Sequence, residues 1–416
     1  MFYKNALTLF AVAMMAVGTS AVAQDTTLVG LLTADENCGK DATKKAGCDP
    51  RDTSWMKPNM DSVKNRVKVG FGVRTSFQGF EAGAESSGAI GGSPGTGGRT
   101  RDFNLDNARI FLSGKINDKM TAYLHTDINN AQGHGTDADE LHILDAAIDY
   151  QISDNVAVKF GRFLPSTDRS NLSGPFFLNA WEFPFVQYSN GYYDIFQGRD
   201  DGVSLYGERG EDVQVKWSLG LFEGYDDAAT TGGKDRLWMV GRVVLNFLDP
   251  EEGYFNSSTY YGEKDIAALG FSFSNQNDAH GNGLDYTAWS MDLLFETTID
   301  SGAVVTLEGA YYDRDHDNSA VGNGLQGEGY FILGSYLFSD STSIGDITGR
   351  LQSSVRYQES DRDAPGVGNR EHQVDYSLNY IIHGHNARVS LILQDINLSG
   401  GVEDQQNLII GGQVRF

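Results

Sequence analysis

Charged side chains recur at every second position in several mainly apolar segments of this 416-residue chain. Alternate residues of a β-strand point to the same face, so these charges share one face while the apolar residues between them share the other. A row of fixed charges beside water attracts, repels and orders mobile ions. Catalysis would need a nucleophile, a base and an acid that converge on one point. The eight histidines are instead scattered along the chain, so the pattern favours electrostatic action on ions over catalysis.

The alternation assigns a set of charged residues to the wet face. The bases are Arg109, Lys159, Lys216, Arg242, Arg350, Arg356 and Arg388. The acids are Asp127, Asp145, Asp149, Asp292, Glu296, Glu308 and Asp375. Acids gather on segments 120–130 and 141–151, whereas several arginines, including Arg415, gather on the late segments. If the strands enclose a narrow water-filled space, opposed rows of charge on its wall produce an electric field across it. Such a field orders water and favours polar solutes over apolar ones.

Sixteen alternating segments can be placed between Val67 and the end of the chain. They span 67–77, 103–114, 120–130, 141–151, 155–162, 201–208, 213–223, 236–246, 265–274, 285–297, 303–313, 328–338, 349–358, 372–382, 386–396 and 406–416. Short and long connections alternate between them, and the eight prolines fall outside them, as a hydrogen-bonded ladder requires. One connection, 247–264, is long where a short one is expected, and the sequence offers no account of it.

These segments predict an all-β, 16-stranded antiparallel transmembrane barrel. The last segment is apolar on one face and polar on the other, and it ends on Phe416. After residue 23, no run of about 18 apolar residues is available for a membrane-spanning helix. A bilayer supplies no hydrogen-bond partners for open sheet edges, so strands cross it only as a closed barrel. In bacterial barrels the short turns lie on the periplasmic side and the long loops outside.

The first residues have the pattern of a secretory leader. Lys4 precedes an apolar stretch, and a small-residue cleavage site ends at Ala23, so we expect residues 1–23 to be a cleaved signal peptide. We place residues 24–66 in the periplasm. There Cys38 and Cys48 predict one disulfide, because two cysteines ten apart in an oxidising compartment pair readily. This segment could contact peptidoglycan, form a plug or act as an inert tether. Residues 67–416 form the barrel.

Residues 163–200 form the longest connection and are rich in aromatic side chains. A loop of this length with so much apolar surface does not lie free in water. We therefore expect this third outer loop to fold inward and narrow the lumen; an external lid and a trimer-contact loop are the alternatives. The charged residues that would then stand at the constriction are Asp168, Arg169, Glu182, Asp194, Arg199, Asp200 and Asp201.

Two stretches carry a resemblance to a known family. Residues 102–114, DFNLDNARIFLSG, and residues 158–165, VKFGRFLP, together with the aromatic end of the chain, resemble the phosphate-selective porin O and P family. The resemblance implies a trimer of 16-stranded barrels in the bacterial outer membrane, each with its own pore. The chain departs from an anion pore in its balance of charge, which is −24.

Together these features predict a water-filled outer-membrane pore for passive diffusion of small hydrophilic solutes, weakly cation-preferring and constricted by the third loop. The alternatives are an anion- or phosphate-selective pore and a structural or adhesive barrel. We expect a homotrimer surrounded by membrane lipid and lipopolysaccharide. We expect no cofactor and no metal, and the acidic balance disfavours nucleic acid.

Overall fold

The computed structural model describes residues 66–81, 99–128, 141–187, 198–225, 236–279, 285–316, 326–362, 370–399 and 404–416. The unit Val69–Phe416 is compact. The predicted leader, the Cys38–Cys48 disulfide and most of the 24–66 segment lie outside the described residues. Among the residues described, no helix is long and apolar enough to cross a bilayer.

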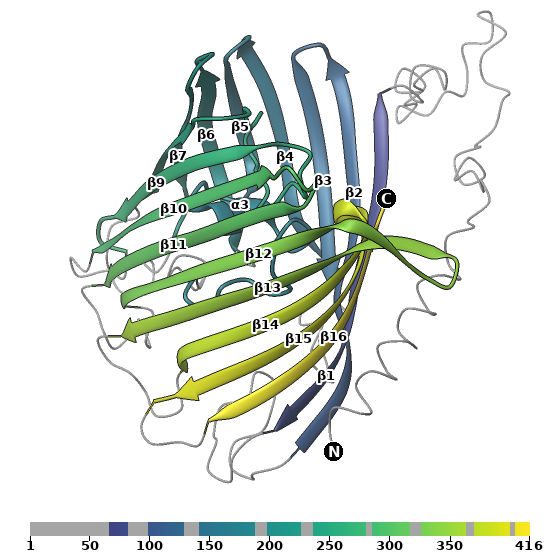
Figure 1. Cartoon of the computed structure of the whole chain (residues 1–416). Coiled ribbons are helices and arrows are strands. Elements are labelled where there is room, and N and C mark those ends of the chain that lie inside the picture. The colour runs from purple at the N-terminus through teal and green to yellow at the C-terminus, as the bar shows by residue number, and fades with distance from the viewer. Residues whose placement is uncertain are drawn as a thin grey trace, which may run out of the picture. The chain divides into compact units, whose positions relative to one another are not determined.

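Sixteen strands follow one another along the described chain (Figure 1). They are β1 (Val67–Glu81), β2 (Arg99–Asn117), β3 (Met120–Ile128), β4 (Leu141–Ser153), β5 (Val156–Phe163), β6 (Asp200–Arg209), β7 (Gln214–Phe222), β8 (Trp238–Asn246), β9 (Ile266–Gln276), β10 (Tyr286–Thr298), β11 (Val304–His316), β12 (Gly327–Ile344), β13 (Ile347–Arg362), β14 (Arg370–His383), β15 (Ala387–Leu398) and β16 (Gln405–Arg415). Two short helices accompany them, α3 (Arg169–Ser173) and the 3₁₀ turn η5 (Gly384–Asn386).

Each strand pairs with its neighbours in sequence, and the sheet closes on itself as a barrel. The closing contact is antiparallel and joins β1 to β16, with Gly72 opposite Arg415 and Ser76 opposite Gly411. The predicted barrel of 16 antiparallel strands is therefore confirmed. Every segment placed from the alternation coincides with a strand to within a few residues at each end, except that β12 and β13 extend past a bulge at Leu337 and Ser341 toward a turn at Gly345.

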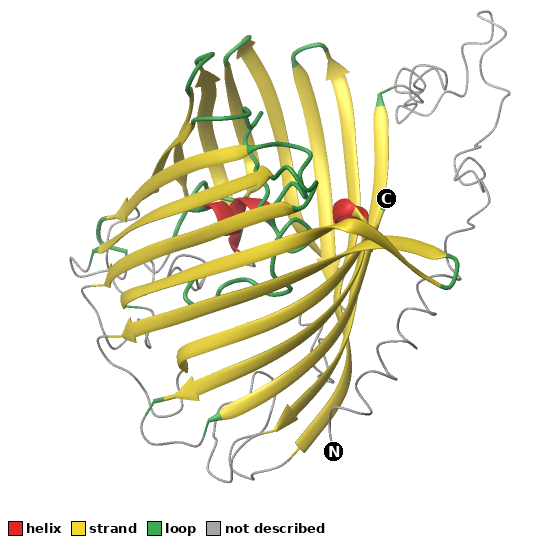
Figure 2. Ribbon diagram, viewed as in Figure 1, coloured by secondary structure: helices red, strands yellow, loops and turns green. Residues whose placement is uncertain are grey.

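The pleat separates an apolar face from a polar one. On β10, Met291, Leu293 and Phe295 are each about two-fifths exposed, whereas Asp292 and Glu296 are buried. Exposed Leu, Val, Ile and Phe side chains continue over the same face of most strands. In water such a band would be costly, but a bilayer accepts it. The polar face is turned toward the inside of the barrel, where a short helix and several loop segments lie within the ring of strands (Figure 2).

Candidate pore constriction

The connection between β5 and β6, residues 164–199, is called loop L3 below. Its described residues, 164–187 and 198–199, lie against the polar face of the sheet. Helix α3 begins where Asp168 accepts a hydrogen bond from the backbone N–H of Asn171, which satisfies one of the free donors of the first turn. Burial raises the pKa of Asp168 above its ordinary value, although that hydrogen bond opposes the shift. Its side chain is thus a structural cap of L3.

Arginines on distant strands hold the backbone of L3 by its carbonyl groups. Arg388 on β15 donates to the carbonyls of Leu178 at 2.9 Å and of Ala180 at 3.1 Å. Arg74 on β1 donates to the carbonyl of Trp181. Further donors from the wall are Arg356 to Glu182 O, Arg314 to Val186 O and Gln413 to Phe176 O. Because these donors occupy β1, β11, β13, β15 and β16, they fix L3 along half of the polar wall.

Aromatic side chains of L3 occupy gaps left by glycine. A Cβ atom built on Gly411 of β16 would lie 2.5 Å from the Trp181 ring, and one built on Gly72 of β1 would lie 2.7 Å from the Phe176 ring. Such distances are far inside van der Waals contact, so a larger residue at either position would displace the ring. Trp181 also lies beneath the Arg74 guanidinium, whose carbon is 4.1 Å from the ring centroid.

A second segment reaches L3 from the opposite end of the barrel. Residues 247–265, called turn T4 below, connect β8 to β9 on the side of the short turns. Tyr254 of T4 donates to the carbonyl of Leu164 at 2.9 Å, and the backbone N–H of Ser258 donates to the carbonyl of Phe177 at 3.1 Å. The unexplained length of this connection now has a physical account, because T4 enters the barrel and packs on L3.

A buried ion pair joins T4 to α3. The guanidinium of Arg169 donates to both carboxylate oxygens of Glu251 at 2.7 Å, and each side chain is 2% exposed. Burial raises the pKa of Glu251, but the Arg169 guanidinium outweighs burial and holds this pKa at about 2. Asp292 on β10 lies 3.8 Å from Arg169 and pairs in turn with Arg242 on β8 at 2.6 Å. L3 and T4 are therefore joined to each other and to the wall.

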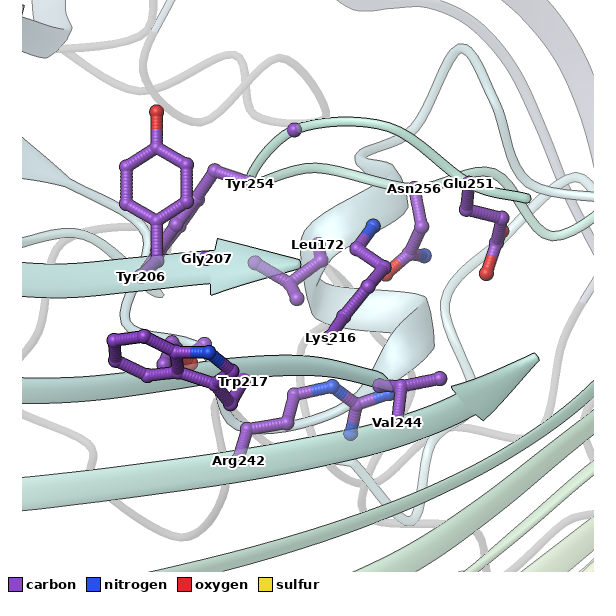
Figure 3. A pocket seen from close by; sticks show the side chains of 13 residues that line it. Leu172, Tyr206, Gly207, Lys216, Trp217, Arg242, Val244, Glu251, Tyr254 and Asn256 are labelled. Carbon is purple, nitrogen blue, oxygen red and sulfur yellow. The ribbon is translucent and has the colours of Figure 1, made fainter. Parts of the chain in front are cut away.

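Figure 3 shows the pocket beside this junction. Lys216 of β7 and Arg242 of β8 approach it from the wall, Leu172 from α3, and Glu251, Tyr254 and Asn256 from T4. The pocket is small and is lined by side chains from β6, β7 and β8 of the wall, from L3 and from T4. The junction is thus closely packed.

The structure pairs most of the charges that the alternation placed on the wet face. The pairs are Arg109–Asp127 at 2.6 Å, Lys159–Asp149 at 2.5 Å, Arg242–Asp292 at 2.6 Å and Arg356–Asp375 at 2.7 Å. Asp145 lies 3.5 Å from Arg199 of L3 and 3.1 Å from His125. Glu296 accepts hydrogen bonds from Thr259, Tyr260 and Gly262 of T4. Lys216, Glu308 and Arg388 are also buried on the polar face.

Two of the candidate charges stand elsewhere. Asp201 was expected at the constriction, but it lies on β6 and pairs with Arg162 of β5 at 2.7 Å, where both side chains are 43% exposed beside Phe160 and Val203 of the apolar face. The expected strand 201–208 already included Asp201, and alternation along β6 places Asp201 on the outward face with Val203 and Leu205, whereas Ser204 is buried on the inward face. Arg350 donates to the carbonyls of Phe338 and Gly302 and lies near the short-turn rim, away from L3.

The other loop charges are placed as follows. Asp168, Arg169, Glu182 and Arg199 lie on L3, and Asp200 accepts a hydrogen bond from the N–H of Gly224. Asp194 lies outside the described residues. Arg74, Glu251 and Trp181 were not singled out from the sequence as functional residues. For Glu251 a signal was present, namely the unusual length of residues 247–264.

Residues 67–235 match the family model described as phosphate-selective porin O and P, a range that includes both stretches that carry the resemblance. The resemblance is thus confirmed. A comparison with curated proteins found no match.

Solved porins share the fold at low identity. The anion-selective porin from Comamonas acidovorans is 15% identical, with a TM-score of 0.53, and the match covers 84% of this chain and 99% of that one. OprB of Pseudomonas putida is 11% identical, with a TM-score of 0.57 and coverage of 87% and 97%. The outer-membrane channel DcaP of Acinetobacter baumannii is 15% identical, with a TM-score of 0.53 and coverage of 84% and 97%. Family match and fold agree on a barrel of the bacterial outer membrane.

Proposed function

We propose that this outer-membrane porin, a chain of the phosphate-selective porin O and P type, lets small hydrophilic solutes diffuse through a lumen narrowed by L3 and prefers anions to cations. The preference for anions is the alternative that the sequence left open. It replaces the weak cation preference that was expected from the acidic balance of the chain and the net acidic set of charges on the third loop.

The observation that carries this proposal is a group of three arginines, Arg74, Arg388 and Arg415, around residues 176–182 of L3, called the tip of L3 below. Among the described residues none of the three has a carboxylate at ion-pair distance. Arg388 is 1% exposed and donates to carbonyls of L3 and to the Tyr261 hydroxyl. Arg74 is 5% exposed and donates to Asn107 and to the carbonyl of Trp181. Arg415 on β16 lies between two aromatic rings. Carbonyl dipoles stabilise Arg388 and Arg74 but carry no net charge, so a positive potential remains at this part of the wall.

The acids of the polar face act mostly as partners of the fold. Asp127, Asp149, Asp292 and Asp375 are each neutralised by a base. Glu296 is buried and accepts hydrogen bonds from backbone N–H groups of T4. Such carboxylates contribute little to the field that a passing ion meets, because their partners already compensate them.

Two half-buried acids, Asp106 and Glu182, lie closer to the long-loop end of the barrel than the three arginines. Asp106 accepts a hydrogen bond from Ser76, and Glu182 accepts one from Gln394. The register of β1 and β16 puts Ser76, and with it Asp106, nearer to the long-loop end than Arg74, since Ser76 lies opposite Gly411 and Arg74 opposite Gln413. Gln394, the donor to Glu182, lies opposite Asn407 of β16, which is further toward the same end. The charge along the lumen therefore changes from acidic toward the outside to basic toward the short turns. An anion would meet its favourable region at and below the tip of L3.

The apolar outer face and the family also support a homotrimer, as expected from the sequence. A trimer would cover part of the exposed apolar band, and lipid and lipopolysaccharide would cover the rest. Electrophoresis of the detergent-solubilised protein without heating tests this assembly: we expect a band at three times the mass of one chain, which heating converts to the monomer.

Reversal potentials in planar bilayers test the ion preference. With a KCl gradient across the membrane, the sign of the zero-current potential reports whether Cl⁻ or K⁺ permeates faster. We expect the sign for Cl⁻. A potential of the opposite sign would restore the weak cation preference, and the lack of any conductance steps would favour a structural or adhesive barrel.

A further inference from the structure

The inner face of β3 is more open than the inner faces of later strands. Along most of β8, β9 and β10 every second residue is buried, because L3 and T4 pack on that side of the barrel. On β3, all of which the structure describes, only Asp127 is buried, and Tyr123 and His125 are partly exposed. His125 lies directly opposite Asp145 of β4, which is buried on the polar face, so alternation turns both exposed side chains inward. Solutes in the lumen therefore reach this part of the wall.

Three rings form a continuous row on this open face. Phe111 of β2 lies directly opposite His125, and their ring centroids are 5.1 Å apart in an edge-to-face arrangement. The His125 ring is in turn 5.3 Å from the ring of Tyr123. All three side chains are partly exposed. A row of aromatic rings that is open to water is typical of a ligand-binding surface.

Hydrogen-bonding groups border the row, and their charges are paired within the protein. The Tyr123 hydroxyl accepts a hydrogen bond from the Lys159 ammonium at 2.7 Å, and the same ammonium donates to Asp149 at 2.5 Å. Nδ1 of His125 lies 3.1 Å from the carboxylate of Asp145, which also lies 3.5 Å from a guanidinium of L3. Each carboxylate beside the row thus has a basic partner. The surface offers rings and polar groups with little net charge.

The solute that fits such a surface is an uncharged ring that carries hydroxyl groups. A pyranose sugar has C–H groups on its ring faces, which pack on aromatic rings, and hydroxyl groups at its edge, which bond to tyrosine, histidine and carboxylate. A simple ion gains no packing contact from Phe111 or Tyr123. A purely apolar ring would displace water from the polar groups of the wall without replacing its hydrogen bonds.

We propose that Phe111, Tyr123 and His125 form a binding surface for pyranose sugars on the inner wall of β2 and β3. The surface rests on one part of the proposed function, a lumen through which small hydrophilic solutes diffuse, and adds a substrate class to it. It does not depend on the preference for anions, because the groups around the row are charge-paired.

Block of the KCl current by maltose tests the surface. Single channels of the full-length protein are recorded in planar bilayers while maltose is added on both sides. Sorbitol at matched viscosity is the control solute, because it carries hydroxyl groups on an open chain without ring faces. We expect maltose to reduce the conductance along a saturating curve and to add current noise, whereas sorbitol should reduce it only as viscosity does. Equal effects of the two solutes would overturn the proposal.

Substitutions separate packing on the rings from changes elsewhere in the barrel. Phe111→Leu and Tyr123→Leu should each raise the half-blocking concentration of maltose about fivefold, as expected for the loss of one ring contact. Tyr123→Phe keeps the ring and should bind maltose nearly as tightly as the unsubstituted protein. Phe160→Leu is the matched control, because it removes a ring that is 63% exposed on the outward face of β5. It should leave the half-blocking concentration unchanged.

Unheated electrophoresis and unitary conductance establish that each variant is folded. If Tyr123→Leu does not assemble, Phe111→Leu decides the outcome, since Phe111 makes no side-chain hydrogen bond that its loss would leave unpaired. A block that Phe160→Leu weakens as much as Phe111→Leu does would refute the surface, because Phe160 lies outside the lumen.

Failure of this surface and failure of the proposed function give different results. An anion-selective reversal potential, with the same maltose block in Phe111→Leu as in the unsubstituted protein, refutes the sugar surface and leaves the anion pore in place. A cation-selective potential, with a block that Phe111→Leu weakens, refutes the anion preference and supports the surface. A lack of conductance steps would refute both.

Discussion

The pair formed by Arg169 and Glu251 should control how firmly L3 is held inside the barrel. Glu251→Gln keeps the size of the side chain but leaves the Arg169 guanidinium, 2% exposed, without its bidentate partner. Removing one member of a buried ion pair costs about 3–5 kcal/mol. Asp292 remains 3.8 Å from Arg169, but it already binds Arg242. We therefore expect a loss near the lower limit, about 3 kcal/mol.

A second route gives a similar magnitude. The pKa of Glu251 is held at about 2, against an ordinary value of 4.5. One pKa unit corresponds to about 1.4 kcal/mol, so the ionised form is favoured in the folded protein by about 3 kcal/mol. Because the folded pKa lies below the unfolded one, this stabilisation is present above pH 4.5 and is lost as the pH falls toward 2. Above pH 5 the variant and the unsubstituted protein should differ by the full amount.

The assay combines stability with a local measurement on L3. Unfolding by guanidinium in detergent, followed by tryptophan fluorescence, gives the free energy, and hydrogen exchange of the amides in residues 168–180 reports loosening of L3. Glu252→Gln is the matched control, because it removes the same charge from the next residue, which is exposed. Single-channel records of Glu251→Gln should show larger current fluctuations than those of the control.

A double variant decides whether the pair itself is responsible. Replacing a buried ion pair by apolar residues of similar volume is often neutral or stabilising, so Arg169→Met with Glu251→Leu should be more stable than either single variant. If the double variant is as unstable as the sum of the singles, the two residues do not act through each other. If Glu251→Gln loses no more than Glu252→Gln, the tether between T4 and L3 has no energetic weight.

Other expected outcomes follow from contacts elsewhere in the barrel. Gly411→Ala should displace the Trp181 ring and cost about 1–3 kcal/mol in the free energy of unfolding, whereas Gly334→Ala, where a Cβ atom meets nothing within 4 Å, should cost much less; equal costs would contradict close packing at Gly411. Burial lowers the pKa of His385 to about 4, so the unsubstituted protein should lose stability as the pH falls from 6.5 to 4, and His385→Phe should remove that slope in titrations of unfolding against pH. The Arg162–Asp201 pair on the outer face is 43% exposed, and Asp201→Asn should leave the KCl reversal potential unchanged; a shift would mean that Asp201 acts on the conducting path after all.

The sequence predicted the sheet almost completely because a barrel wall enforces a strict alternation. Each of β10, β13 and β14 must present apolar side chains to lipid and polar ones inward, so the period alone gives both the strand and its faces. The same rule identified Arg109, Asp127 and Arg356 as inward-facing. At the end of a strand the rule is easily set aside for a loop assignment: Asp201 was counted with the charges of the loop, although it lies on β6 and alternation turns it outward.

The partners of those charges could not be read in the same way. Whether Arg356 meets Asp375 depends on the register between β13 and β14, which is set by turns and bulges. Arg388 meets carbonyl groups of L3, which every residue possesses and no side-chain pattern reveals. T4 has no strict alternation, so its insertion beside α3 left no periodic signal. Its length and its aromatic residues, Tyr254, Phe255, Tyr260 and Tyr261, are the features that distinguish it.

The glycine gaps filled by Trp181 and Phe176 have a consequence for assembly. Gly72 and Gly411 belong to β1 and β16, strands at opposite ends of the sheet in sequence that meet when the cylinder shuts. Before β1 and β16 pair, Trp181 and Phe176 of L3 can contact only one side of their final packing site. We therefore expect pairing of β1 with β16 and docking of L3 to be one cooperative event. The Trp181 and Phe176 rings fit only the correct register between these two strands, so they stabilise that register over a shifted one.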